Sequence, residues 1–492
     1  MQTHFTPGQL LDPDLATSEQ ILRKCVHCGF CTATCPTYVL LGDELDSPRG
    51  RIYLIKDMLE GSRPATQPVV QHLDRCLSCL ACMTTCPSGV HYQHLIDHAR
   101  VHVERTYRRP WKERLVRALL ARVVPYPGRL RAALALAALV GRTVRTAPRR
   151  SDAAQDKLLA ACRAMLALAA SIRAKRRPGP SVAPVAPVAP VAPASTAAGG
   201  HRPRGRVALL SGCAQSVLNP EGQAAAARLI ERSGFEVVKI DGCCGALVHH
   251  LGRAEHAHEF AARVLQQVDA ELKRGALDAV VATASGCGTH LKDYGHLLRN
   301  DQRYAAEAVR LSDLTRDITE WLEASGWDPG GASAPHRGLL VAYHSACSMQ
   351  HGQRLGRTPQ RLLERAGFVV REIPEGHLCC GSAGTYNVLQ PQLAAQLRDR
   401  KLRNIRSTSA QLVAAGNVGC IVQLAGEGNL PIVHTAELLD WAQGGPEPGS
   451  LTLPARSESF PDRRPGAADV PGSSGIRDAQ SPRPSPGTGE TP

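Results

Sequence analysis

The two halves of the chain differ in how their apolar residues are spaced. In the first half, the stretch from about Arg49 to Glu60 carries four apolar residues at helical spacing, and Gly61 follows it as a terminator. Between Arg206 and Leu439, short apolar runs rich in β-branched residues alternate with helical stretches. That alternation is typical of a parallel α/β sheet. We therefore predict a multidomain α+β protein that is helical first and α/β afterwards.

The α/β half contains the same pattern twice, and each copy places four cysteines just after apolar runs. The first cysteine precedes a Cys-Cys pair by 30 positions in one copy and 32 in the other, and the last cysteine follows the pair by 43 and 40. Because open parallel sheets bind ligands at the carboxyl ends of their strands, we expect the cysteines of each copy to converge above a sheet. They are Cys213, Cys243, Cys244 and Cys287 in the first copy, and Cys347, Cys379, Cys380 and Cys420 in the second.

These eight cysteines are compatible with three kinds of site. They could bind one further iron–sulfur cluster per copy, they could carry redox-active thiols or zinc, or the paired cysteines could be partly structural. Two adjacent cysteines cannot point the same way from a regular strand. Each Cys-Cys pair therefore predicts irregular backbone, whichever interpretation holds.

The clearest chemistry lies in two cysteine runs of the helical half, CVHCGFCTATCP at 25–36 and CLSCLACMTTCP at 76–87. Each has the spacing C-x2-C-x2-C-x3-C-P, which holds [4Fe–4S] clusters in bacterial-type ferredoxins. Zinc sites more often pair units of two cysteines. The helical insert between the runs favours an α-helical ferredoxin domain over a compact β-rich one. We predict that the chain moves electrons.

Ligands for two clusters follow from the spacing. Three thiolates separated by two residues each cover one face of a cluster, and in two-cluster ferredoxins the fourth cysteine of each run ligates the other cluster. The first predicted cluster is bound by Cys25, Cys28, Cys31 and Cys86, and the second by Cys35, Cys76, Cys79 and Cys82. Sharing ligands in this way places the two clusters side by side.

Changes of composition predict the domain boundaries. A proline at every third position of VAPVAPVAPVAP, residues 182–193, favours an extended, semi-rigid linker. The end of the chain is rich in Pro, Gly, Ser and Arg, which predicts disorder. The predicted division is an α-helical ferredoxin domain at 1–104, a basic helical spacer and Pro-rich linker at 105–204, Cys-Cys-Gly repeats at 205–330 and 331–442, and a disordered tail at 443–492.

The formal net charge of +14 is concentrated in one segment. Residues 105–177 contain 19 Lys and Arg against three acids, a surplus of +16, so the rest of the chain sums to −2. Three roles fit the basic helices predicted there: a solvated spacer, a surface that lies on anionic lipid, or a docking site for an acidic partner subunit. Because the rest of the chain is not basic, we expect no nucleic-acid partner.

The opening residues, MQTHFTPGQLLDPDLATSEQ, are polar and acidic, without the pattern of a secretory or twin-arginine signal. The longest apolar run, Ala132 to Gly141, is shorter than the roughly twenty residues that a membrane-spanning helix needs. We expect a cytoplasmic protein, or one peripheral on the inner face of the cell membrane. In that compartment the 17 cysteines are better interpreted as metal ligands than as disulfides.

The paired ferredoxin runs, the connecting stretch GDELDSPRGRIYLIKDMLEG and the two Cys-Cys-Gly repeats resemble the iron–sulfur subunits of glycolate oxidase. These subunits belong to a broader family with subunits of lactate-utilisation enzymes, anaerobic glycerol-3-phosphate dehydrogenase and heterodisulfide reductase. The resemblance covers residues from about 15 to 104 and from 205 to 440. Heterodisulfide reductase repeats usually end in a C-x2-C pair, whereas here Cys287 is followed by GTH and Cys420 by IVQ.

The resemblance implies an electron-transfer subunit without catalytic residues of its own for substrate oxidation. FAD is expected on a partner flavoprotein only, which oxidises glycolate to glyoxylate and passes electrons through this chain toward a membrane quinone or another acceptor. The sequence agrees, since it has no G-x-G-x-x-G loop after a strand and no P-loop. The alternatives are a subunit of lactate or glycerol-3-phosphate dehydrogenase, or a thiol-disulfide enzyme like heterodisulfide reductase that uses the repeats as catalytic centres.

Overall fold

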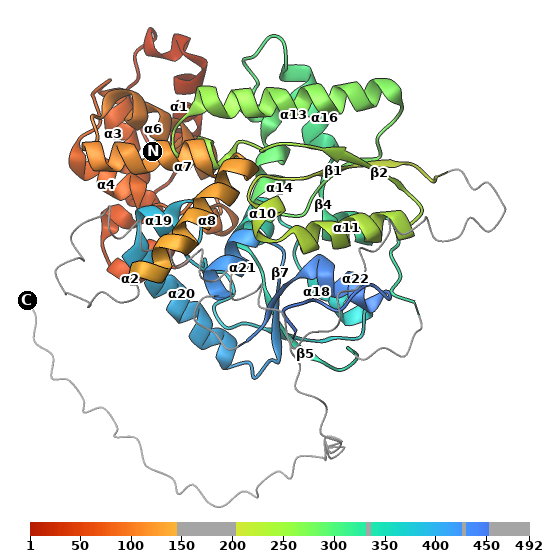
Figure 1. Cartoon of the computed structure of the whole chain (residues 1–492). Coiled ribbons are helices and arrows are strands. Elements are labelled where there is room, and N and C mark those ends of the chain that lie inside the picture. The colour runs from red at the N-terminus through yellow and green to blue at the C-terminus, as the bar shows by residue number, and fades with distance from the viewer. Residues whose placement is uncertain (145–202, 331–335, 426–429, 452–492) are drawn as a thin grey trace, which may run out of the picture. The chain divides into compact units, whose positions relative to one another are not determined.

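The computed structural model of the chain describes residues 1–144, 203–330, 336–425 and 430–451, and side chains within residues 1–144 are described up to 139 (Figure 1). The Pro-rich linker at 182–193 lies outside these residues. So does the predicted disordered tail from residue 452 onward.

The first part of the chain is helical, as predicted, and no strand occurs among the described residues up to 144. Prolines begin three of its helices, where a missing amide donor costs nothing and the fixed φ suits the first turn. The helix predicted from Arg49 to Glu60 is confirmed and begins one residue earlier. The elements are η1 (Gln9–Leu11), α1 (Pro13–Lys24), α2 (Pro36–Leu41), η2 (Glu44–Asp46), α3 (Pro48–Glu60), α4 (Gln67–Asp74), α5 (Ala81–Thr85) and α6 (Tyr92–Thr106).

Two basic helices follow, α7 (Trp111–Val123) and α8 (Pro127–Val144). Their basic residues are partly built into the fold, because Arg109, just before α7, and Arg117 are buried and both pair with Asp74 on α4. The segment predicted to be a basic spacer therefore also contains buried ion pairs with the ferredoxin domain. None of the described helices is both long enough and apolar enough to cross a bilayer.

The first Cys-Cys-Gly repeat, repeat 1, forms a four-stranded parallel sheet in the order β2-β1-β3-β4. Figure 1 shows α11 along one face of this sheet and α13 along the other. The elements are β1 (Arg206–Leu210), α10 (Gln215–Leu218), α11 (Pro220–Arg232), β2 (Glu236–Ile240), α12 (Ala246–His250), α13 (Ala254–Arg274), β3 (Ala279–Ala282), α14 (Ser285–Lys292), α15 (Tyr294–Leu297), α16 (Ala305–Leu314), β4 (Thr315–Asp317) and α17 (Ile318–Ala324).

Repeat 2 forms a second four-stranded parallel sheet in the equivalent order, β6-β5-β7-β8. The predicted fold class, a helical domain followed by a duplicated α/β unit with parallel sheets, is confirmed. The elements are β5 (Leu340–His344), a π-helical turn η4 (Ser348–Gly352), α18 (Thr358–Arg365), β6 (Val369–Glu372), α19 (Tyr386–Leu389), α20 (Pro391–Arg406), β7 (Leu412–Ala415), α21 (Val418–Ala425), β8 (Ile432–His434) and α22 (Thr435–Ala442).

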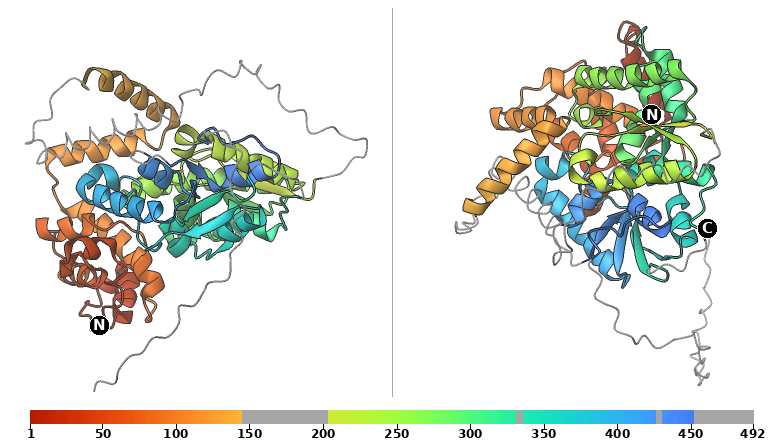
Figure 2. Two further views of the ribbon diagram at one scale, coloured as in Figure 1. Left: turned by 90° about the horizontal axis from the view of Figure 1, so that it is seen from below. Right: turned by 45° about the vertical axis from the view of Figure 1, so that its right-hand side comes forward.

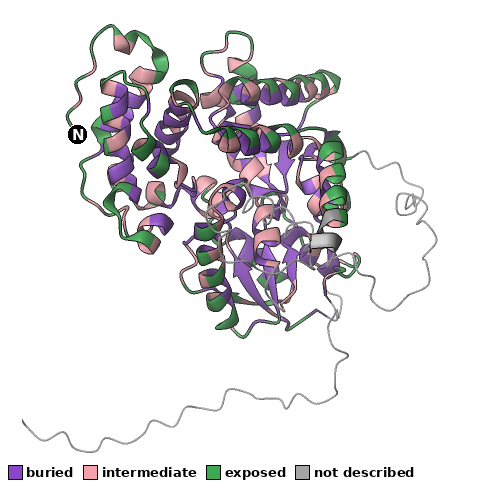
Figure 3. Ribbon diagram, turned by 60° about the vertical axis from the view of Figure 1, so that its left-hand side comes forward, coloured by how far each residue is buried: buried purple, intermediate pink, exposed green. Residues whose placement is uncertain are grey.

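The cores explain the alternation of apolar residues in the strands. In β1, Val207 and Leu209 pack toward α11, whereas Ala208 and Leu210 pack toward α13, because successive side chains of a strand point to opposite faces. Because helices cover both faces of the sheet, the central strands are continuous apolar runs in the sequence and do not alternate between polar and apolar residues. Figure 3 shows the central strands almost entirely buried.

The two repeats are held together by polar contacts as well as by a shared core. Asp440 of α22 is buried and accepts hydrogen bonds from Arg228 and Arg232 of α11 at 2.6 and 2.8 Å. His434, at the end of β8, donates from Nε2 to the carbonyl of Thr283 at 2.9 Å. The second contact joins the carboxyl end of β8 to the residue that follows β3. Figure 2 shows the two repeats, coloured from yellow-green to blue, packed side by side.

Candidate functional site

The first ferredoxin run surrounds a pocket with one cysteine of the second run. Cys25 follows α1 and Cys86 follows α5, and both line this pocket together with Cys28 and Cys31. The backbone between them turns through left-handed conformations at His27 (φ 58°) and Gly29 (φ 87°), which lets a short loop present several thiols to one point. The four cysteines predicted for the first cluster therefore face one space, and Cys82 reaches the same pocket.

The four cysteines predicted for the second cluster also lie together, in a more buried place. Burial raises the pKa of the Cys82 thiol, and its neighbours Cys79, Cys76 and Cys35 raise it further. The thiol of Cys35 lies 3.8 Å from the guanidinium of Arg51 and 3.3 Å from the hydroxyl of Thr37. Crowded thiols can ionise together only if a cation or a metal offsets their charge.

Arg51 supplies a buried positive charge beside the second set. Its side chain is almost fully buried, pairs with Asp46 at 3.1 Å and donates to the carbonyl of His72 at 2.7 Å. Burial opposes its charge, but Cys76, Tyr92 and Cys35 raise its pKa above the ordinary value. Four cysteine thiolates are the usual ligands of a [4Fe–4S] cluster, and a nearby cation and hydrogen bonds to the sulfurs adjust its reduction potential. These four cysteines and Arg51 therefore fit such a cluster.

The structure brings the four cysteines of repeat 1 together as well. Cys213 follows β1, the pair follows β2, and Cys287 lies in the first turn of α14. Hydrogen bonds link them in a chain from Cys213 through Cys243 and Cys244 to Cys287. Those from Cys243 and Cys287 lower the pKa of the Cys244 thiol below its usual range.

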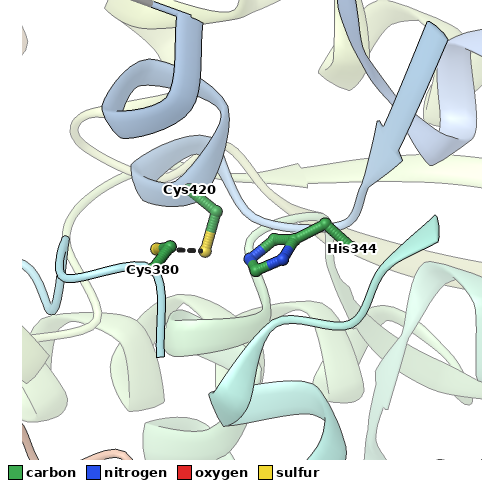
Figure 4. Close-up of side chains that lie close together, drawn as sticks. All are labelled: His344, Cys380 and Cys420. Atoms are coloured by element: carbon green, nitrogen blue, oxygen red, sulfur yellow. Dashed lines mark hydrogen bonds between the residues drawn. The ribbon is translucent and has the colours of Figure 1, made fainter. Parts of the chain in front are cut away.

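In repeat 2, the sulfurs of Cys347 and Cys379 are 3.8 Å apart and those of Cys380 and Cys420 are 3.3 Å apart. His344, the last residue of β5, points at the latter pair, as Figure 4 shows. A ring nitrogen of His344 and the two sulfurs all lie within 4.8 Å of one another. The Nε2 atom of His344 is buried without a hydrogen-bond partner, and burial lowers the pKa of the ring to about 3, which leaves a neutral imidazole.

Each Cys-Cys pair ends in a glycine that the fold requires. Gly245 and Gly381 have φ of 87° and 86°. A Cβ at Gly245 would meet the carbonyl of Ala257 at 3.1 Å, and one at Gly381 would meet that of Ala394 at 2.6 Å. The irregular backbone predicted for the pairs is therefore present, and it brings α13 and α20 close to the cysteine loops.

The histidines beside the cysteines could not be singled out in sequence, and their positions differ between the repeats. His344 stands three residues before Cys347, where repeat 1 has Leu210. His290 stands three residues after Cys287 and next to Cys244, where repeat 2 has Gln423. Aligning the two copies on their cysteines would have shown these two histidines as positions at which the copies differ.

Known proteins resemble the chain over nearly its whole length. Residues 21–90 match the 4Fe-4S dicluster domain family, and residues 207–292 and 341–425 each match the cysteine-rich CCG domain family. The "Glycolate oxidase iron-sulfur subunit" of Escherichia coli (strain K12) is 40% identical over 447 residues, which are 90% of this chain and 99% of that protein. The chain belongs to the family of glycolate oxidase iron–sulfur subunits.

Other relatives extend the comparison. The "Probable glycolate oxidase iron-sulfur subunit" of Bacillus subtilis (strain 168) is 31% identical over 86% of this chain and 94% of its own. "Lactate utilization protein A" of the same strain is 27% identical over 48% of this chain and 99% of its own. The resemblance stated from the sequence is thereby confirmed for the glycolate oxidase iron–sulfur family.

In this member of the family, the ferredoxin loop of the second run packs against repeat 2. Cys79 and Leu77 share one apolar cluster with Cys379 and Tyr386, and Cys347 borders it. Cys347 is also the neighbouring thiol with the largest effect in raising the pKa of Cys79, after burial itself. The hydroxyl of Thr84 donates to Nδ1 of His351 in η4 at 2.8 Å, which fixes the contact.

The cysteines of repeat 1 have a different cover. Val116, Leu120 and Ala121 of α7 pack on Cys213 and Cys243 in one cluster. The basic helix that sequence indicated as a spacer thus shields the cysteine loops of repeat 1 from solvent with its apolar face. Trp111, Leu115 and Leu119 lie on the outer face of α7 and are exposed.

Proposed function

We propose that the chain is the electron-transfer subunit of a flavin-linked 2-hydroxyacid oxidase, with glycolate as the substrate class. A partner flavoprotein that holds FAD would oxidise glycolate to glyoxylate and deliver the electrons to this chain, which passes them toward a quinone-type acceptor. The observation that carries the proposal is the arrangement of thiols: two ferredoxin sets side by side, the second packed against the cysteines of repeat 2.

The ligand sets follow from this arrangement. Clusters of [4Fe–4S] type, when bound, each take one electron at a time and so suit a relay that starts at a two-electron flavin. We assign Cys25, Cys28, Cys31 and Cys86 to the first and Cys35, Cys76, Cys79 and Cys82 to the second. The guanidinium of Arg51 lies 3.8 Å from the sulfur of Cys35, and the hydroxyl of Tyr92 lies 3.8 Å from the sulfur of Cys76. Both side chains would stabilise negative charge on the cluster sulfurs and exclude water from them.

The cysteines of the repeats are buried in a way that favours metal or cluster ligation over catalytic thiol chemistry. A reactive cysteine is accessible and has a lowered pKa. Cys379 and Cys380 are almost fully buried, and both have raised pKa values. Cys244 of repeat 1 has a lowered pKa but is equally buried, so its thiol is not accessible either. We therefore assign Cys347, Cys379, Cys380 and Cys420, with His344, to a metal-binding centre of repeat 2, and Cys213, Cys243, Cys244 and Cys287 to the corresponding centre of repeat 1.

The decisive experiment assembles the chain with its FAD-binding partners under anaerobic conditions. About eight iron atoms per chain are expected for the ferredoxin clusters alone, and glycolate should reduce an artificial electron acceptor only when both proteins are present. Cys35→Ser should weaken the paramagnetic resonance signal of the second cluster more than that of the first, and Cys28→Ser should do the reverse. Zinc in place of iron, or disulfide turnover by the isolated chain, would contradict the proposal.

The outer face of α7 and α8 supports a membrane-facing role. Trp111, Leu115 and Leu119 recur every four residues along α7 and are 65%, 43% and 52% exposed, and Leu136 and Leu139 of α8 are exposed as well. A basic segment with an exposed apolar stripe and an interfacial tryptophan binds anionic lipid without crossing it. We assign this face to the inner leaflet, where a quinone would be reached.

Flotation with vesicles that contain anionic lipid tests this assignment. The Trp111→Ala/Leu115→Ala double variant should lose most of the vesicle-bound fraction, and high salt should weaken binding of the unmodified chain. Leu11→Ala, which removes an even more exposed leucine from η1, is the control and should bind like the unmodified chain. Equal binding to neutral and anionic vesicles, or none, would contradict the assignment.

A further inference from the structure

A second group of metal-ligating side chains lies between α6 and repeat 1. Asp97 comes from α6, and His249 and His250 end α12, the short helix after the Cys-Cys-Gly of repeat 1. One ligand atom from each residue lies within 4.8 Å of the others. Nδ1 of His249 is 3.8 Å from Oδ2 of Asp97, and Nδ1 of His250 is 3.9 Å from Oδ1.

The polar atoms of this group have no hydrogen-bond partners. Both carboxylate oxygens of Asp97 and the Nδ1 atoms of both histidines are buried and unpaired. Asp97 is 5% exposed. Arg100 lies 3.6 Å away, but its guanidinium donates instead to the carbonyl of Cys76 and the hydroxyl of Ser78. Asp97 therefore has charged neighbours but no hydrogen-bond donor, which is unfavourable for a buried carboxylate.

The separations are too long for hydrogen bonds but suit a shared ion. Two atoms that each lie about 2.1 Å from a tetrahedral metal ion are about 3.4 Å apart, so a small contraction would close the site. His290 of α14 lies beside the group: its Nε2 atom is buried and unpaired, and its ring centre is 5.1 Å from that of His249.

The protonation states of the group are those of metal ligands. Burial lowers the pKa of His249 to about 4, so the imidazole is neutral at physiological pH. Burial alone would raise the pKa of Asp97, but the guanidinium of Arg100 is among the nearby groups that hold it below its usual range, so the carboxylate is ionised. Metal binding requires neutral imidazole and ionised carboxylate.

We propose that Asp97, His249 and His250, with His290 beside them, bind one zinc ion that clamps α6 to repeat 1. Three imidazoles and one carboxylate form a closed, four-coordinate nitrogen and oxygen set, which is typical of zinc and contains no sulfur. The clamp acts on the ferredoxin clusters indirectly, because α6 also carries Arg100, which holds the Cys76 loop in place.

Metal analysis of the complete complex tests the proposal. The protein is prepared anaerobically, passed through a chelating resin, and analysed for zinc and iron by mass spectrometry. One zinc per chain is expected. Asp97→Asn and His249→Gln should each lower the zinc content at least about tenfold, a loss of the size seen when supporting groups of metal sites are removed, with iron content and visible absorption unchanged.

The matched control is Asp293→Asn. It makes the same chemical change at the same interface, where Asp293 accepts from Nε2 of His94 at 2.8 Å and from Gln93 at 3.1 Å, outside the proposed ligand set. This variant should keep its zinc. Zinc lost from Asp293→Asn but kept by Asp97→Asn, or no zinc in the unmodified protein, would overturn the proposal. If Asp97→Asn also loses iron, the more exposed His250→Gln decides by the same two measurements.

X-ray absorption at the zinc edge separates this site from the cysteine centres. The proposed set gives nitrogen and oxygen scatterers at about 2.0 to 2.2 Å and none at about 2.3 Å. A sulfur shell at about 2.3 Å would place the zinc among the cysteines and overturn the proposal.

Discussion

In repeat 1 the cysteine loops lie under α7, whereas in repeat 2 they lie against the ferredoxin loop that carries Cys79. The strand order and the positions of the four cysteines are equivalent, so the difference comes from what packs on each copy. Repeat 2 is in direct contact with the second ferredoxin set. Repeat 1 reaches the ferredoxin domain through α6 and α12, on the side of the Asp97 group. One scaffold therefore makes two different contacts, with the second ferredoxin set in repeat 2 and with α6 and α7 in repeat 1.

The same comparison holds residue by residue. The strand end that holds Leu210 in repeat 1 holds His344 in repeat 2, beside Cys380 and Cys420. After the fourth strand, Asp317 caps α17 in repeat 1, and His434 caps α22 in repeat 2. A duplicated backbone fixes where side chains can act, and single substitutions at these positions decide what they do there.

The largest expected difference between the repeats is in electron transfer. If the relay continues into repeat 2, Cys380→Ser should lower glycolate-dependent acceptor reduction by the assembled oxidase by about a hundredfold, or about 2.7 kcal/mol in barrier, because Cys380 adjoins Cys379, which shares an apolar cluster with Cys79. Cys244→Ser, the equivalent change in repeat 1, should cost less than about tenfold. Initial rates with matched iron content measure both. A larger loss for Cys244→Ser would reverse the assignment of roles.

The histidine at the end of β5 gives a narrower test. His344→Leu installs the residue of repeat 1 and should weaken metal binding in repeat 2 at least about tenfold, with a shifted signal in paramagnetic resonance. His377→Leu alters a histidine in the loop that carries Cys379 and Cys380; its side chain lies outside the group of His344, Cys380 and Cys420, so the signal should stay in place. Identical spectra for His344→Leu and the unmodified protein would exclude His344 as a ligand.

Much of this comparison was accessible from the sequence, because it rests on local spacing. The apolar spacing from Arg49 to Glu60 predicted the helix between the ferredoxin runs, and the cysteines of each copy do follow strands of a parallel sheet. The packing of α7 on Cys213 and of Cys79 on Cys379 was not predictable, since both join residues that are far apart in the sequence. The burial of Arg109 and Arg117 against Asp74 was missed for the same reason, because a count of charges cannot tell a paired arginine from a solvated one.

The cover over repeat 1 predicts an effect on stability. Leu120 is 5% exposed and packs against the Cys213 and Cys243 loops, so Leu120→Ala should destabilise the protein by about 2 to 5 kcal/mol and speed alkylation of those thiols. Leu119→Ala, one residue away but 52% exposed, should cost less than about 0.5 kcal/mol. Unfolding midpoints and alkylation rates measure both. Equal effects would show that α7 does not shield repeat 1.

The smallest expected effect comes from the caps after the fourth strands. Burial raises the pKa of Asp317 to about 6, although Thr319 donates to its carboxylate and Lys292 lies near; Glu320 raises the pKa further. The unfolded value is about 3.9, so the folded state binds the proton more tightly, and stability falls as pH rises from about 4 to 6. Two pKa units correspond to at most about 3 kcal/mol.

Asp317→Asn keeps the cap and removes the titrating group, so the stability of this variant should fall less between pH 4 and pH 7 than that of the unmodified protein. Asp313→Asn, an exposed acid on α16, controls for the charge. If Asp317→Asn and the unmodified chain lose stability in parallel over this range, Asp317 is ionised in the folded state and repeat 1 gains its cap at no electrostatic cost.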